Sequence, residues 1–336
     1  MSQTDLASRH LRPHRGGIIP TRHQLPAFLR RWALAALLVT TLADAAPRET
    51  ASPTMKPTPA PYVLDFTTAT NPALQAAVEA LDVRLRAKFG MTAEQTSAGV
   101  LDLNTLRLAL VRPDRIDYAA SVPKIGILLA WFQLHPEAAT ALDPVTRHEL
   151  GLMIKVSDNA MAAKYSQLLG LKAIQQVLDS YGLYDATHGG GLWVGKHYGK
   201  GTERYPDPVG GHSHAATVRQ LLRYYLLLEQ DQLVSPAASA TMREIFTSPD
   251  IAHIQDKFVK GLAPLRQGSE GQAGRDVEVR RKAGWWEDWF LDTAIVTGGG
   301  RHYIVVAMTH HPKGDDYLVD FAAAVDDLLT EGAPRP

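Results

Sequence analysis

The sequence predicts an α+β fold, in which strands from early and late in the folded part of the chain share one antiparallel sheet. Three observations lead to this prediction. Apolar residues alternate with a period of two between residues 97 and 111, and strand-like apolar runs return between residues 277 and 308. Between these regions the apolar residues recur at helical spacing. The order is therefore strands, helices, strands, rather than the strict alternation that produces a parallel sheet.

The first elements have clear boundaries. A helix is expected over residues 71–89, because Asn71 can cap it, Pro72 suits its first turn and Gly90 can end it. A β-hairpin follows over residues 97–111. Further helices are expected over residues 121–132, 143–154, 161–169, 216–228, 236–246 and 318–329, and further strands over residues 277–279, 289–296 and 303–308. Residues 181–211 lack periodicity but are rich in glycine and aromatic residues, so we expect an ordered, functional loop.

The N-terminus predicts export. Basic residues between positions 9 and 31 precede the apolar run 32–39 and the small residues 43–46, which is the order of a secretory signal. The apolar run is short for a transmembrane span, although a membrane anchor or a buried helix is the alternative. We therefore expect residues 1–46 to be a signal peptide with a basic N-terminal extension, residues 47–61 to be a linker, and residues 62–333 to form a periplasmic or secreted domain.

Composition excludes several classes of protein. Lysine and arginine total 35 and so do aspartate and glutamate, so no net charge favours nucleic acid or an anionic membrane. The absence of cysteine excludes disulfides, thiolate metal sites and a cysteine nucleophile. No phosphate-binding, dinucleotide-binding or zinc-protease motif is present. We expect no cofactor, no metal ion and no stable membrane span, and we expect a monomer.

The motif Ser121-Val122-Pro123-Lys124 is the first candidate for catalysis. It places a hydroxyl and an amine one helical turn apart at the start of an apolar run. An amine whose pKa is lowered by burial can accept the serine proton, and free N–H groups at a helix start can face an oxyanion. Such a quartet also arises by chance, and the alternative is a core helix with an exposed lysine.

Two further motifs follow in order, Ser157-Asp158-Asn159 and Lys282-Ala283-Gly284. Separately, the first could be only a helix cap and the second only a strand end at a solvated edge. Together the three motifs resemble the S-x-x-K, S-D-N and K-T-G set of class A β-lactamases and penicillin-binding proteins. The resemblance covers nearly everything after the linker. It implies a β-lactamase/DD-peptidase-like catalytic domain over residues 62–333, with a five-stranded antiparallel sheet flanked by helices and an inserted helical lobe.

The resemblance also implies roles for individual residues. Ser121 would form the acyl-enzyme, Lys124 would be its general base, and Ser157 would relay a proton to the leaving nitrogen. Backbone N–H groups of Ser121 and Trp285 would form the oxyanion hole. The other expected substrate-binding residues are Asn159, Lys282 and Gly284, while Asp158 would anchor its loop. The implied substrate is a small molecule, either a β-lactam whose amide bond is hydrolysed or a cell-wall peptide.

The chain departs from that pattern in three places. The interval between Ser121 and Ser157 is shorter than is usual in class A β-lactamases, which implies a trimmed helical lobe. Ala283 replaces a hydroxyl residue that would bind a substrate carboxylate. The glutamate that activates the deacylating water, within Glu-x-x-Leu-Asn, has no counterpart; Glu203 is the nearest candidate, with Asp185 and His188 weaker. Two alternatives therefore stay open beside the β-lactamase: a penicillin-binding-type peptidase or esterase with slow deacylation, and a non-catalytic cell-wall or peptide-binding module on the same fold.

Other motifs predict less. Residues 211–215 approximate a nucleophile elbow, but the preceding prolines cannot lie in a central strand, so we expect Ser213 or His214 to cap the helix that starts near Ala216. The histidine pairs 212/214 and 310/311 lack a carboxylate cluster for metal binding. Trp285, Trp286 and Trp289 could stack on sugars, but aromatic residues beside a strand more often belong to the core.

Overall fold

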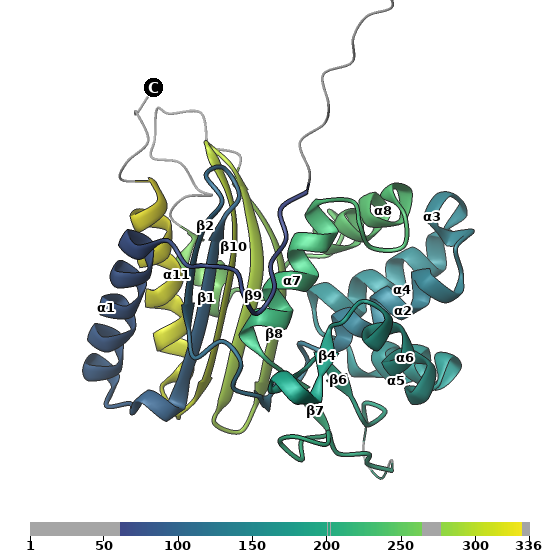
Figure 1. Cartoon of the computed structure of the whole chain (residues 1–336). Coiled ribbons are helices and arrows are strands. Elements are labelled where there is room, and N and C mark those ends of the chain that lie inside the picture. The colour runs from purple at the N-terminus through teal and green to yellow at the C-terminus, as the bar shows by residue number, and fades with distance from the viewer. Residues whose placement is uncertain (1–60, 200, 202, 264–276, 331–336) are drawn as a thin grey trace, which may run out of the picture. The chain divides into compact units, whose positions relative to one another are not determined.

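The computed structural model describes residues 61–199, 201, 203–263 and 277–330 (Figure 1). The expected signal peptide, and the expected linker apart from residue 61, lie outside the described residues. The described residues belong to one unit of the chain, Pro59–Pro336. Among them, no helix has both the length and the apolar character needed to cross a membrane.

One five-stranded antiparallel sheet organises this unit, in the strand order β2-β1-β10-β9-β8 (Figure 1). The strands are β1 (Thr96–Asp102), β2 (Arg107–Val111), β8 (Glu278–Trp286), β9 (Trp289–Gly298) and β10 (Arg301–His310). The early strand β1 pairs directly with the late strand β10, with Val100 opposite Val305. The predicted α+β fold is therefore confirmed, including one antiparallel sheet that joins strands from both ends of the domain.

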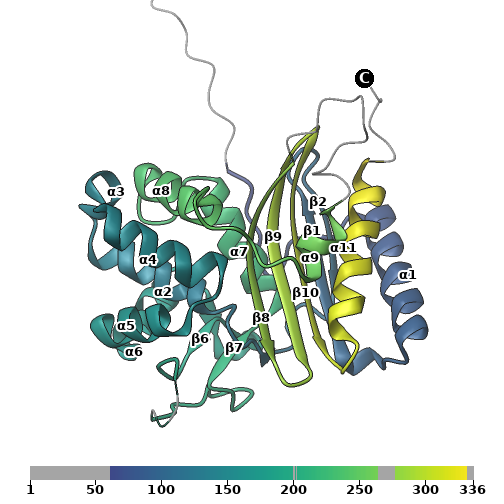
Figure 2. The same ribbon diagram turned by 180° about the vertical axis from the view of Figure 1, so that it is seen from behind.

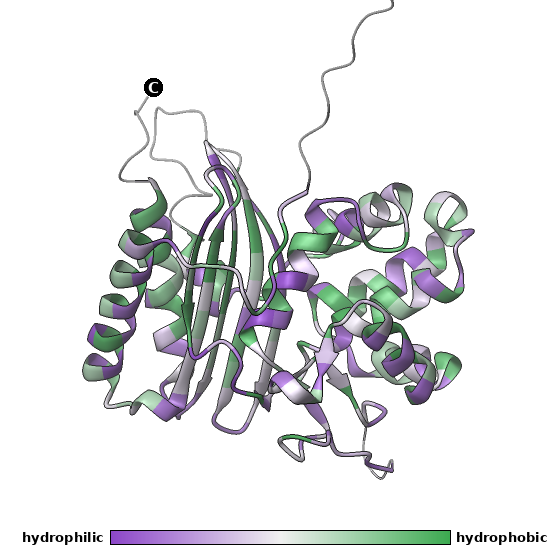
Figure 3. Ribbon diagram, in the orientation of Figure 1, coloured by the Kyte–Doolittle hydropathy of each residue, from purple (hydrophilic) through white to green (hydrophobic). Residues whose placement is uncertain are grey.

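Helices cover both faces of the sheet, as Figures 1 and 2 show from opposite sides. On one face lie α1 (Pro72–Phe89), α9 (Lys257–Gly261) and α11 (Gly314–Thr330). A hydrophobic core lies on each side of the sheet, and alternate residues of β10 belong to one or the other. Tyr303, Val305 and Ala307 pack toward these helices, and Ile304, Val306 and Met308 pack toward the opposite face. Because both faces are buried, β10 is apolar without interruption from Tyr303 to Met308, and much of the sheet is coloured as hydrophobic in Figure 3. Strand β8 is the exception, because it carries Glu278, Arg280, Arg281 and Lys282.

The helical lobe on the other face is built around α2 (Lys124–Leu134), which is apolar on nearly every side and buried among its neighbours. The remaining helices on this side are α3 (Ala138–Ala141), α4 (Pro144–Lys155), α5 (Asn159–Leu169), α6 (Leu171–Ser180), α7 (Val218–Glu229) and α8 (Pro236–Thr247). Asn71 caps α1 as predicted, and Asp143 caps α4 by accepting a hydrogen bond from the Thr146 backbone N–H. Helix α6 was not predicted, because Gly170 ends α5 and starts the next helix at once.

The loop over residues 181–211 contains short strands instead of irregular chain alone. These are β4 (Tyr184–Asp185), β5 (Gly190–Gly191) and β6 (Trp193–Val194), with the 3₁₀ turn η2 (Ala186–His188); a second 3₁₀ turn, η1 (Ala93–Gln95), precedes β1. Strand β6 joins β7 (His214–Ala216) and β3 (Asp117–Tyr118) in a small sheet. The prediction that Ser213 or His214 caps the next helix was wrong. Residues 214–216 pair as a strand, and Thr217 caps α7 by accepting a hydrogen bond from the Gln220 backbone N–H.

Candidate active site

Ser121 lies in the tight turn between β3 and α2. The residue before it, Ala120, has a left-handed backbone with φ of 46°, which is unusual for a residue with a side chain. The helix, expected over residues 121–132, starts at Lys124, and Pro123 occupies its N-cap position without a side-chain hydrogen bond. The Ser121 carbonyl accepts a hydrogen bond of 3.3 Å from the Lys124 backbone N–H, so the two motif residues are held one turn apart.

Lys124 is fully buried beneath this turn. Its Nζ donates to the backbone oxygen of Ser157 at 2.6 Å and to Oδ1 of Asn159 at 2.7 Å, and it lies 3.2 Å from Oγ of Ser157. Burial lowers the pKa of Lys124 to about 7, against the opposing charge of Asp158. A substantial fraction of the amine is therefore neutral near pH 7 and able to accept a proton.

The Ser157-Asp158-Asn159 motif forms the corner between α4 and α5. Ser157 has a left-handed backbone with φ of 60°, and Asp158 caps α5 by accepting a 2.8 Å hydrogen bond from the Met161 backbone N–H. Asn159 is the first residue of the helix. The corner therefore presents the Ser157 hydroxyl and the Asn159 amide toward Lys124, while Asp158 is used to anchor the corner.

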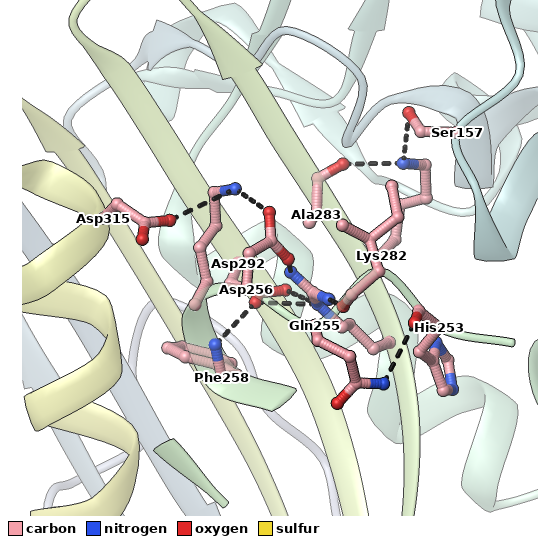
Figure 4. A network of polar contacts seen from close by, with 12 residues as sticks. Ser157, His253, Gln255, Asp256, Phe258, Lys282, Ala283, Asp292 and Asp315 are labelled. Atoms are coloured by element: carbon pink, nitrogen blue, oxygen red, sulfur yellow. Dashed lines mark hydrogen bonds and ion pairs between the residues drawn. The ribbon is translucent and has the colours of Figure 1, made fainter. Parts of the chain in front are cut away.

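Lys282 comes from the middle of β8, which continues to Trp286, beyond the motif. Its side chain is 1% exposed, and its Nζ donates to Oγ of Ser157 at 2.9 Å and to the Ala283 carbonyl at 2.6 Å (Figure 4). Burial, together with the charge of Lys124, lowers the pKa of Lys282 well below its ordinary value. The hydroxyl of Ser157 thus lies between two amines from opposite sides of the site.

Gly284 brings β8 against the nucleophile turn. A Cβ at this position would lie 2.8 Å from the Ala119 carbonyl oxygen and 3.2 Å from the Ser121 backbone nitrogen. Only glycine allows this approach without a shift of backbone. The next residue, Trp285, is 62% exposed. Its backbone comes directly after this close approach along β8, while its side chain lies largely at the surface.

A cleft of about 470 Å³ opens between the three motifs. It is lined by Ser121, Ser157, Asn159, Ala283, Gly284 and Trp285, among others. Lys124 and Lys282 lie beneath this wall, in contact with Ser157. The structure therefore brings together all seven residues that the sequence analysis selected, although they come from three separate regions of the chain.

The far end of the cleft contains charged residues that the sequence analysis did not select: Asp256, Lys257 and Asp315. Lys257 pairs with Asp256 at 2.5 Å and lies 3.5 Å from Asp315. Asp256 also binds Arg281, which pairs with the buried Asp292 (Figure 4). Each of these cations already has a carboxylate partner. No short motif links the five residues, so their proximity became apparent only in the fold.

The expected candidates for a deacylating base lie elsewhere. Glu203 accepts a hydrogen bond from the Tyr205 hydroxyl, and Asp185 pairs with His188 in an exposed turn. In the described part of the chain, every hydrogen-bond acceptor of Lys124 is a backbone, hydroxyl or amide oxygen, and none is a carboxylate.

Two of the three tryptophans differ from the expectation. Trp285 and Trp286 are exposed, so the expectation that they belong to the core was wrong; Trp289 is partly buried and stacks on His310 at 3.8 Å between ring centroids. Within the residues that the structure describes, no cluster of three or more potential metal ligands occurs.

The sheet, the helical lobe and the cleft between them have the architecture of serine β-lactamases and penicillin-binding proteins. A β-lactamase from Sphaerobacter thermophilus superposes with a TM-score of 0.60 at 16% identity, over 78% of this chain and 99% of that one. A class A β-lactamase from Mycobacterium abscessus gives 0.56 at 19% identity, over 76% and 100% of the two chains. The penicillin-binding protein PBP-A gives 0.54 at 17% identity, over 75% and 96%.

At these identities the likeness establishes the fold, and a sequence profile establishes the family. Residues 144–331, more than half of the chain, match the profile of the beta-lactamase enzyme family. The chain therefore belongs to this family, as its three motifs predicted. The matched residues begin after Ser121 and Lys124, so these two positions are placed in the site by the structure. No curated protein sequence matches the chain significantly.

Proposed function

We propose that this protein is a serine hydrolase that is acylated at Ser121 by the amide carbonyl of a β-lactam. The observation that supports the proposal most directly is the arrangement of two buried amines on one hydroxyl. Lys124 and Lys282 lie 3.2 and 2.9 Å from Oγ of Ser157, beside the cleft that Ser121 lines. Two buried amines beside one serine hydroxyl do not help to stabilise a core, whereas proton transfer during acylation requires such groups.

The acylation step follows from these positions. Neutral Lys124 takes the proton of the Ser121 hydroxyl as Oγ attacks the carbonyl carbon, and the backbone N–H groups of Ser121 and Trp285 bind the oxyanion. When the intermediate collapses, the lactam C–N bond breaks and an ester to Ser121 remains. Ser157 passes a proton to the departing nitrogen and recovers one from the amines. Asn159 binds the substrate amide, and Lys282 supplies positive potential at the cleft.

The sequence contains no Glu-x-x-Leu-Asn motif, which in the family it resembles supplies the carboxylate that activates the deacylating water. Since no carboxylate contacts Lys124 in the described part of the chain, we propose that the acyl-enzyme is hydrolysed slowly. This observation favours a second candidate function, a penicillin-binding-type peptidase or esterase that is trapped by β-lactams. A variant of PBP-A, which shares the fold at a TM-score of 0.54, is known as an acyl-enzyme complex with penicillin G. We further propose that the protein acts as an exported monomer.

Intact-protein mass spectrometry after addition of penicillin G tests both candidates. We expect an adduct with the mass of the whole β-lactam on the wild-type protein and none on Ser121→Ala. An adduct that disappears within seconds, with steady nitrocefin hydrolysis, indicates a β-lactamase. An adduct that persists for minutes or longer indicates the penicillin-binding type. Absence of any adduct on the wild-type protein would overturn the proposed chemistry and leave a binding module.

A further inference from the structure

Tyr198, in the loop that follows β6, contacts the residue before Ser121 and also the amine of Lys124. Its hydroxyl donates to the Ala120 carbonyl at 3.1 Å, one residue before the nucleophile. Its ring centroid lies 4.6 Å from Nζ of Lys124 and 4.3 Å from the ring centroid of His214. The side chain is buried among these groups. The acylation mechanism proposed above assigns no role to Tyr198.

We propose that Tyr198 is a positioning residue for acylation, whose hydroxyl fixes the turn that orients Ser121 and whose ring keeps water away from the Lys124 amine. This inference rests on the proposed function, since it assigns Tyr198 a task in the same reaction.

The hydroxyl acts on a strained turn. A left-handed backbone at a residue such as Ala120 costs on the order of 1 kcal/mol or more and persists only where its surroundings hold it. Two backbone hydrogen bonds also hold this turn. The Ala119 N–H donates to the His214 carbonyl of the small sheet at 2.8 Å, and the Val122 N–H donates to the Ala119 carbonyl within the turn at 2.9 Å. The hydrogen bond from Tyr198 fixes the Ala120 peptide, and thereby the direction in which Ser121 leaves the turn.

The ring completes the enclosure of the Lys124 amine. The amine meets Ser157, Asp158 and Asn159 at the start of α5, and Lys282 of β8 donates to the same Ser157 hydroxyl from the other side. On the loop side the amine meets the Tyr198 ring, which in turn contacts His214 of β7.

Neither ring on that side supplies a base or a charge. Burial lowers the pKa of His214 to about 4 and raises the pKa of Tyr198 well above its ordinary value, so both are neutral near pH 7. The loop therefore presents Lys124 with an apolar, water-excluding surface, which favours the neutral amine that acylation requires.

A matched pair of variants tests the role of the hydroxyl. Tyr198→Phe removes only the hydrogen bond to Ala120. The control, Tyr224→Phe, removes another buried tyrosine hydroxyl that donates to a backbone carbonyl at 3.1 Å, that of Ile125 inside α2. Both should lower the melting temperature similarly. We expect the acylation rate with nitrocefin to fall roughly tenfold or more in Tyr198→Phe and to stay within about twofold in Tyr224→Phe.

The ring is tested by the pH dependence of acylation. Tyr198→Ala lets water reach Lys124, so the midpoint of the rate profile should move to higher pH, whereas Tyr198→Phe should keep the wild-type midpoint. Equal acylation rates in Tyr198→Phe and the wild type, or equal losses in both phenylalanine variants, would overturn the inference.

A crystal structure of Tyr198→Phe decides the point independently of activity. If the wild-type protein forms no adduct, the proposed function fails. In that case, an unchanged left-handed Ala120 in the variant also overturns the positioning role, and a relaxed Ala120 supports it.

Discussion

At the level of single residues, the proposed chemistry depends on how completely two lysines lose water. Lys124 is fully buried and its pKa is lowered to about 7, so its amine gains a proton below that pH and loses it above. Only the neutral form can accept the proton of Ser121. The acylation rate should therefore rise as the pH increases through about 7 and then level off.

Replacement of this lysine should suppress acylation far more than it affects folding. We expect Lys124→Ala to lower the single-turnover acylation rate by roughly a thousandfold, because a general base typically contributes 10²–10⁴-fold. Lys164→Ala is the matched control, since that lysine is exposed on α5 and pairs with Glu149. Stopped-flow measurements with nitrocefin between about pH 5 and 9 provide both the rates and the profile. A flat profile for the wild-type protein would contradict the role of Lys124 as the base.

Ala283 is the residue at which substrate preference should be easiest to change. It lines the cleft without a hydroxyl, and Lys257 and Arg281 are already paired with carboxylates, so a substrate carboxylate finds few free donors. We expect Ala283→Thr to increase acylation efficiency with penicillin G about tenfold, the effect of one charge-assisted hydrogen bond. Ala283→Val has the same shape without the hydroxyl and should give no increase. An equal gain in both variants would point to packing and away from carboxylate binding.

At the level of elements, the site exists because β8 passes the nucleophile turn at backbone contact. Gly284→Ala should reduce acylation at least a hundredfold, because the added Cβ forces β8 away from Ala119 and Ser121. The control is Gly99→Ala, whose Cβ would meet the side chains of Leu222 and Val218 where β1 packs on α7, and none of these residues lines the cleft. Both variants should lose stability in thermal unfolding, but only Gly284→Ala should lose labelling by a fluorescent penicillin. Normal labelling of Gly284→Ala would show that the close approach is dispensable.

Elements were predictable where one local signal defined them. Asn71 and Gly90 mark the ends of α1, and the alternation in residues 97–111 defines the hairpin. The signals failed where tertiary pairing decides the structure. Residues 214–216 became a strand because β3 and β6 lie on either side of them, which no local pattern reveals.

The candidate site shows the same division between local and tertiary information. Its three motifs were readable because each is short and chemically distinctive. The residues at the far end of the cleft, and Tyr198 on the loop, were not readable, because their significance comes from contacts with residues distant in the sequence.

At the level of the whole described unit, one buried carboxylate ties the first helix to the last. Asp82 of α1 is 1% exposed and accepts hydrogen bonds from Thr96 of β1 at 2.7 Å, from Arg112 after β2 at 2.7 Å and from Tyr317 of α11 at 2.8 Å. Burial alone would raise the pKa of Asp82. The hydrogen bonds from Arg112, Thr96 and Tyr317 outweigh it, so the pKa is lowered. The carboxylate therefore stabilises the fold in its charged form.

This arrangement predicts a pH-dependent loss of stability in Asp82→Asn. Since the folded pKa of Asp82 is lowered, its contribution is complete above the unfolded value of about 3.9 and disappears as the pH falls through the folded value. At pH 7 we expect Asp82→Asn to lower the free energy of unfolding by about 3 kcal/mol, because Arg112 is left partly buried without its partner. Asp320→Asn, which removes the partner of the exposed Lys88, should cost about 0.5 kcal/mol or less. Urea unfolding at a series of pH values measures both differences. The gap between Asp82→Asn and the wild type should narrow below about pH 4, and a gap that stays constant to lower pH would show that the loss comes from packing rather than from the charge.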